Sequence, residues 1–177
     1  MFMPTSRYTF VLQMIVYTVF SYYIDRSIKT TIAMMNEQVR RIMTTDHMTV
    51  NPGQSIQEVT ELMQQKKIQQ IPVVEAGKLV GLVTSYDLWK KTKQQTTENQ
   101  QTVQDVMTTN VLTISPLDKV GTAAQLFADK RFKTLPVVNL DNDLKGVVTA
   151  FDVIRQAYLS EFPEPSLYKK EFIRSEE

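Results

Sequence analysis

Two segments of the chain show the same succession of hydrophobic patterns. Each begins with a short strand-like piece that ends at a proline, and a stretch with apolar residues at helical spacing follows. Two apolar runs separated by a turn come next, and their continuous apolar character predicts strands buried on both faces. A further helix is expected after Thr84 in the first segment and after Thr149 in the second. The early pieces and first helices are predicted over 48–52 and 55–67, and over 112–116 and 117–130.

The two segments are copies of one unit. Before the turn between the strands, matching residues are 64 positions apart, and after it they are 65 apart. The extra residue falls in the turn, where an insertion is tolerated best. The matching pieces are Met-Thr-Thr at 43–45 and 107–109, Ile-Pro-Val-Val at 71–74 with Leu-Pro-Val-Val at 135–138, and Gly-Leu-Val-Thr at 81–84 with Gly-Val-Val-Thr at 146–149.

The duplication divides the chain into five parts. We expect an N-terminal extension over 1–34, a first unit over 39–89, a polar linker over 90–101, a second unit over 102–156 and a tail over 157–177. One unit is too small to cover both sides of its own sheet, whereas two packed together can do so. The units are therefore expected to pack on each other.

The repeated pattern resembles the CBS domain pair, or Bateman module. The pattern is MTxxxxTVxP, an amphipathic helix, IPVV and GLVTxxD, and its two copies span about two thirds of the chain, from residue 39 to about 155. The resemblance implies an α/β (α+β) fold of two βαββα units related by a pseudo-twofold axis. It also implies a homodimer, and Tyr86 and Trp89 are expected at a dimer contact.

The same resemblance implies a regulatory module that binds AMP, ADP, ATP or S-adenosylmethionine. Carried over by position, the ligand-binding residues are Thr84 and Asp87 in one unit and Thr149 and Asp152 in the other. A carboxylate can accept hydrogen bonds from both ribose hydroxyls, and a helix start suits a phosphate. Thr-x-x-Asp is also a common way to begin a helix, so a capping role stays open beside the ligand role.

The early segments are expected to supply the adenine wall. The resemblance suggests that each cleft combines the aspartate of one unit with the early segment of the other. For the aliphatic residues, core packing is the alternative. The expected groupings are Asp152 with Asn51 and Ile56, and Asp87 with Ser115 and Val120.

Basic residues precede the strands in both units, unequally. Arg131 and Lys133 in the second unit are expected to face phosphate, whereas the first unit has Lys66 and Lys67 followed by neutral glutamines. The alternative is a solvated helix C-terminus, where cations complement the dipole. The asymmetry predicts two inequivalent clefts, of which the more cationic prefers more phosphate.

The amino-acid composition excludes several classes of function. The chain has no cysteine, and its one histidine, His47, is expected in a loop rather than at a ligand. Thiol catalysis and a multi-histidine metal site are thereby excluded. The net charge of +1 gives no reason to expect nucleic-acid binding. We expect no catalysis, no metal and no required cofactor. The expected function is that of a cytoplasmic regulator of an unidentified partner. The alternative is a structural dimerisation or interaction module with vestigial clefts.

Residues 8–24 are apolar and allow three interpretations. They form a membrane anchor, or an additional helix or strand packed on the module or at a dimer contact. In the third interpretation, translation starts near Met34 or Met35 and the segment is not part of the protein.

Overall fold

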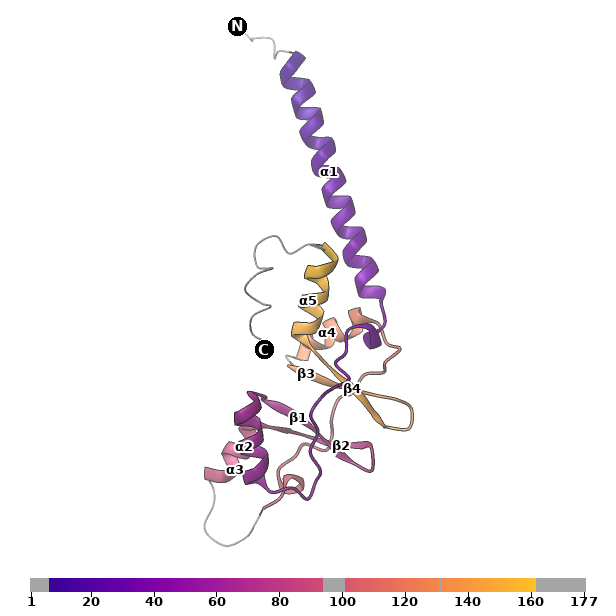
Figure 1. The fold of residues 1–177 in the computed structure, drawn as a ribbon. Coiled ribbons are helices and arrows are strands. Elements are labelled where there is room, and N and C mark those ends of the chain that lie inside the picture. The colour runs from indigo at the N-terminus through magenta and orange to yellow at the C-terminus, as the bar shows by residue number, and fades with distance from the viewer. Residues whose placement is uncertain (1–6, 94–100, 131, 162–177) are drawn as a thin grey trace, which may run out of the picture.

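The computed structural model describes residues 7–93, 101–130 and 132–161, and it shows the predicted order of helix, two strands and helix twice (Figure 1). The first unit contains α2 (Ile56–Lys66), β1 (Gln70–Glu75), β2 (Lys78–Thr84) and α3 (Ser85–Lys93). The second contains α4 (Val120–Lys130), β3 (Thr134–Val138), β4 (Leu144–Thr149) and α5 (Ala150–Glu161). The long helix α1 (Arg7–Asn36) and the short 3-10 helices η1 (Val39–Arg41) and η2 (Val103–Asp105) precede the units.

Helix α2 begins at a reciprocal cap. The Oγ of Ser55 accepts from the backbone N–H of Glu58 at 3.2 Å, and the Glu58 carboxylate accepts from the N–H of Ser55 at 3.3 Å. These bonds satisfy N–H groups that no helical carbonyl can reach. Val59 and Met63, four residues apart, then place the apolar face of the helix in the core.

Helix α4 begins at Val120, three residues later than predicted. Residues 115–118 form a polar turn instead, in which the N–H of Ser115 donates to Asp118 Oδ2 at 2.8 Å. The N–H of Leu117 donates to Ser115 Oγ at 3.2 Å. The backbone N–H of Val120 donates to the carbonyl of Glu37 at 2.8 Å, so the first helical turn is anchored on the segment after α1.

Each unit has an antiparallel hairpin, β1 with β2 and β3 with β4. The early strand of each unit is reduced to a single parallel bridge, between Val50 and Val73 and between Ile114 and Val137. A proline follows two residues after each bridge, and proline cannot donate to a strand ladder. The early strands are therefore much shorter than the predicted pieces.

The segment that leads into each unit pairs with the hairpin of the other unit. Thr44 exchanges backbone hydrogen bonds of 2.9 and 3.0 Å with Val147 in β4. Thr108 exchanges two of 2.9 Å with Leu82 in β2. The 64- and 65-residue offsets of the sequence repeat relate these two pairings, which gives the molecule its internal twofold character.

The two cores mix the units accordingly. Val39, at the start of the first unit, is buried with residues of the second unit, and Val103, at the start of the second, is buried with residues of the first. The predicted boundaries at 39 and 102 follow the sequence repeat, whereas the packing exchanges the leading segments. The tips of the two hairpins also meet, since Lys78 Nζ donates to the carbonyl of Asp141 at 2.6 Å.

The N-terminal extension forms helix α1, and the side chains of residues 14–24 are exposed rather than packed on the two units. The last turns of α1 pack on α4 and α5, where Met34 is buried and only 2% exposed. The rest of the helix extends away from the two units (Figure 1). Among the described residues, no helix combines the length and the apolar character needed to cross a membrane.

Candidate functional site

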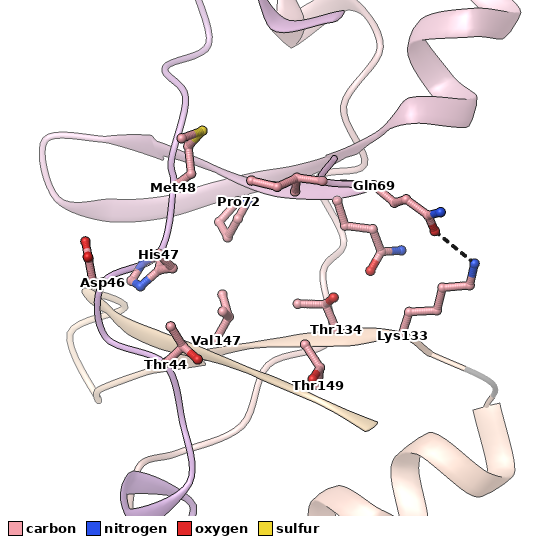
Figure 2. A pocket seen from close by; sticks show the side chains of 12 residues that line it. Thr44, Asp46, His47, Met48, Gln69, Pro72, Lys133, Thr134, Val147 and Thr149 are labelled. Carbon is pink, nitrogen blue, oxygen red and sulfur yellow. Dashed lines mark hydrogen bonds between the residues drawn. The ribbon is translucent and has the colours of Figure 1, made fainter. Parts of the chain in front are cut away.

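A cavity of about 340 Å³ lies between the two hairpins, within the size range of small-molecule sites (Figure 2). Its wall comes from the leading segment of the first unit, from the entries to β1 and β3, and from β4. The lining residues are Thr44, Asp46, His47, Met48, Ile68, Gln69, Gln70, Pro72, Lys133, Thr134, Val147 and Thr149.

The two ends of the cavity differ in charge. Figure 2 shows Lys133 beside Gln69 at one end, and Asp46 beside His47 at the other. Lys133 Nζ donates to Gln69 Oε1 at 3.2 Å. These two residues occupy equivalent positions of the two units, 64 residues apart, so the ammonium group lies where the units meet. This end suits an anionic group.

The strand-to-helix corner of the second unit borders the cavity through Thr149. The N–H and Oγ1 of Thr149 donate to Asp152 Oδ2 at 2.8 and 2.7 Å, and the N–H of Asp152 donates to Thr149 Oγ1 at 3.2 Å. The helix-starting role is therefore present. Within the described part of the chain, the other oxygen, Oδ1, makes no hydrogen bond, so the helix start uses only one of the two carboxylate oxygens.

The equivalent corner of the first unit has the same arrangement. The N–H and Oγ1 of Thr84 donate to Asp87 Oδ2 at 3.1 and 2.6 Å, and the N–H of Asp87 donates back at 3.2 Å. Neither residue lines the cavity described above. Thr149 therefore borders this cavity without its counterpart from the first unit.

The four predicted wall residues lie elsewhere. Ile56 and Val120 are 4% and 0% exposed and belong to the two cores, which corresponds to their alternative role of core packing. Asn51 and Ser115 lie in turns, where their side-chain oxygens accept from backbone N–H groups at 3.1 and 3.2 Å. None of the four lines the cavity, and Arg131 lies outside the described residues.

Lys133 and Thr149 are the predicted residues that the structure brings to one cavity, with Asp152 hydrogen-bonded to Thr149. The sequence analysis missed the leading segment 44–48, including His47. The recurrence of Met-Thr-Thr ahead of both units was the available signal, because it marks the segment that pairs with the other hairpin.

A second cavity of about 580 Å³ lies on the outer side of the first unit, between α2 and α3. Met63, Leu88 and Trp89 contribute its apolar wall, and Gln64 and Lys67 lie at its polar side. In the described residues, no cluster of three or more histidine, cysteine, aspartate or glutamate side chains is suited to hold a metal ion.

Comparison with known proteins places both units in one family. The profile described as the CBS domain matches residues 39–88 and 103–158, which is more than half of the chain. The CBS domain-containing protein YhcV of Bacillus subtilis is 38% identical over 115 residues, covering 65% of this chain and 81% of that protein. The homoserine O-acetyltransferase of Methanohalobium evestigatum is 36% identical over 118 residues, but the chain spans only 23% of its length.

Solved structures show the same likeness. CBSX2 in complex with AMP has a TM-score of 0.61 and 31% identity, covering 68% of this chain and 95% of that one. CBSX2 from Arabidopsis thaliana has also been solved and has a TM-score of 0.62. The CBS domain pair of protein MJ0100, in complex with 5-methylthioadenosine and S-adenosyl-L-methionine, has a TM-score of 0.59 and 30% identity, covering 67% of this chain and 94% of that one.

Proposed function

The chain belongs to the CBS-domain family as a tandem pair, and on this premise we propose that it is a regulatory module that binds an adenine nucleotide, or a related adenosine ligand, between its two units. The observation that carries the proposal is the cavity in which Lys133 and Thr149 of the second unit face the leading segment and β1 of the first. Ligand-bound relatives with AMP or S-adenosylmethionine support the ligand class.

The chemistry of the wall suggests how a nucleotide is held. Lys133 and Gln69 would bind the phosphate, since an ammonium group and an amide donate to its oxygens. Asp152 Oδ1 would accept from ribose hydroxyls beside Thr149. Met48, Pro72 and other residues line the part of the cavity away from Lys133 with apolar side chains. The flat base would bind against them.

Lys133 is the only cation among the described residues that line the cavity. A single cation can compensate the negative charge of one phosphate but not of two further ones. We therefore expect AMP to bind at least as tightly as ATP. AMP, ADP, ATP and S-adenosylmethionine form the panel of candidate ligands.

We propose a cytoplasmic regulatory role without catalysis. The cavity is lined by both units, so a ligand that contacts both favours one arrangement of the hairpins over others. A partner protein that binds this arrangement would receive the signal. The regulated partner is to be found by comparing captured proteins with and without nucleotide.

A thermal-shift panel tests the binding proposal. A ligand that binds only the folded state stabilises it by about 2.7 kcal/mol at 100 times its Kd, which for a chain of this size raises Tm by roughly 5–11 °C. Asp152→Ala should abolish most of this rise. Asp87→Ala is the matched control, because it removes the same carboxylate bonds to the preceding threonine at the start of α3, at a corner that does not line this cavity.

If AMP, ADP, ATP and S-adenosylmethionine all leave the Tm of the wild-type chain unchanged, the binding proposal fails. The alternative, a dimerisation module with vestigial clefts, would then account for the fold. It predicts an association state that does not change with nucleotide in sedimentation experiments.

We also propose that the module is a homodimer. Helices α3 and α5 expose large apolar side chains at matching positions, Tyr86 with Phe151 and Trp89 with Ile154. The exposed fractions of Phe151 and Ile154 are 71% and 63%. A second copy of the chain would cover such a face.

A further inference from the structure

Helix α1 exposes a long apolar surface that neither the packing of the two units nor the nucleotide proposal uses. Its last turns are held by the second unit, where Met34 is buried and a Cβ on Gly121 of α4 would lie 3.2 Å from the carbonyl oxygen of Met35. Between residues 14 and 32, in contrast, eleven large apolar side chains are exposed. The largest apolar patch on an ordinary monomer covers about 300–600 Å² and often has a function. The exposed part of α1 is therefore a candidate interaction surface.

The part of this surface nearest the two units forms a stripe. Ile24, Ile28 and Ile32 follow one another at four-residue spacing, which places them along one side of the helix. They are 45%, 54% and 56% exposed. Tyr17, two turns before Ile24, and Met14, two heptads before Ile28, are exposed on the same side. We call these five residues the isoleucine stripe.

The two flanks of the isoleucine stripe differ. On one flank, Met34 faces α4 and α5 and belongs to the core of the second unit. On the other flank, Lys29 Nζ and Asp25 Oδ2 form an ion pair of 2.6 Å. An apolar seam at helical spacing with charged residues at its edge is typical of a helix that packs against another helix. The stripe is not the side that the second unit already covers.

The place of α1 in the fold favours a second copy of the chain as the partner helix. Helix α5 packs beside the last turns of α1 (Figure 1). It also exposes Phe151 and Ile154, which belong to the proposed dimer face. In a contact of twofold symmetry, a surface near the axis meets its own copy. A dimer that forms through α5 would therefore bring two identical isoleucine stripes into reach of each other.

We propose that the isoleucine stripe pairs with that of a second copy, so that two parallel α1 helices extend the dimer interface beyond the two units. The inference rests on the proposed homodimer. Four of the exposed side chains on α1 are aromatic, and an aromatic side chain buries about 150–250 Å² when it is covered. A stable dimer buries about 800 Å² per partner, and α1 together with α5 offers apolar surface of that order. Both contacts belong to one dimer, so a buried charge in either should dissociate it.

Cysteine cross-linking tests the pairing directly, because the chain has no cysteine of its own. Parallel pairing sets each Ile28 against its counterpart in the second copy. Full-length Ile28→Cys should therefore form a disulfide-linked dimer under mild oxidation, since a disulfide needs its two Cβ atoms close together. Arg26→Cys is the matched control, because Arg26 is exposed on the opposite side of the same helix. It should stay largely unlinked on a non-reducing gel.

Sedimentation gives the second test. Ile24→Glu and Ile28→Glu should each weaken the dimer at least about ten-fold, because a charge would have to be buried between the helices. Arg26→Glu introduces the same charge on the opposite side and should associate as the wild type does. Both isoleucines are exposed in the single chain, so circular dichroism should show that the variants are folded.

The possible failures are distinguishable. If the wild-type chain dimerises, Ile28→Glu dimerises equally tightly and Ile28→Cys cross-links no more than Arg26→Cys, the pairing of α1 is overturned and the homodimer through α3 and α5 stands. A wild-type chain that is monomeric at all concentrations overturns both. Vesicles of phosphatidylcholine and phosphatidylglycerol test the other occupant. Binding to them that Ile28→Glu abolishes, with no change in association, would assign the stripe to a lipid surface and overturn the pairing.

Discussion

Asp152 and Asp87 each use one carboxylate oxygen at the start of a helix, and in the proposed nucleotide site the second oxygen of Asp152 is available to the ligand. In each, Oδ2 takes the hydrogen bonds of the preceding threonine, while Oδ1 accepts none from the described residues. The bonds to Oδ2 fix the rotamer of the side chain. A ligand that binds Oδ1 therefore meets an acceptor that is already oriented.

Asp143 lies at the centre of a surface hydrogen-bond network that predicts acid sensitivity of the fold. A hydrogen bond from Asn139 at 2.8 Å, and further bonds from Lys78 and Lys145, hold the pKa of its carboxyl below the ordinary value. The stabilisation is complete above the unfolded pKa, near pH 4, and is lost as pH falls through the lower folded pKa.

We therefore expect Asp143→Asn to lose stability at neutral pH and to flatten the decline of stability between about pH 5 and pH 2. Urea unfolding across this range measures the effect. Asp141→Asn is a suitable control, because its backbone carbonyl, rather than its carboxylate, accepts from Lys78. Equal acid sensitivity of Asp143→Asn and wild type would contradict the prediction.

The sequence predicted some site residues and missed others for physical reasons. Thr149 and Lys133 were accessible because they lie within the repeated motif and its flanking basic cluster. Helical periodicity predicted Ile56 and Val120 in the core, and the family resemblance also predicted that they contact the ligand. Their burial agrees with the core role. The position of His47 in the cavity wall results from the long-range pairing of the leading segment with the hairpin of the other unit. No local sequence pattern predicts that pairing.

At the scale of elements, periodicity and turn residues located the hairpins and most helices. The apolar runs became β1 and β3 with three buried residues each, and positive φ angles at Gly77 and Asn142 mark the two turns. The late start of α4 was missed, because a side chain-to-backbone turn at 115–118 competes with the helix. The exchange of leading segments was missed because it is a long-range pairing.

The glycine of Gly-Val-Val-Thr is explained by this exchange. A Cβ at Gly146 would lie 2.8 Å from the carbonyl oxygen of Thr44 and 3.1 Å from Met43 Sδ. Gly146→Ala should therefore destabilise the chain by about 1–3 kcal/mol through overpacking. Denaturant unfolding measures this free energy. Gly53→Ala is the control, since its Cβ would meet only Asn51 Oδ1 at 3.6 Å.

At the scale of the molecule, the apolar faces of α3 and α5 predict association. Ile154→Glu and Phe151→Glu should each convert a dimer to a monomer in analytical ultracentrifugation, because a charge would have to be buried at the interface. Leu140→Glu, at a fully exposed position in the turn between β3 and β4, should leave the association state unchanged. A wild-type chain that sediments as a monomer at all concentrations would refute the homodimer.

The exchange of leading segments makes the two equivalent halves unequal during synthesis. When the second half emerges from the ribosome, Val39 and Thr44 are already available to complete it. The first half must wait for Val103 and Thr108, which are translated after its own last helix. At 5–20 residues per second this delay lasts about a second or more, during which the growing N-terminal half has an unfilled core and an unpaired strand edge. Nascent chains stalled before residue 103 should accordingly be the ones that chaperones recognise.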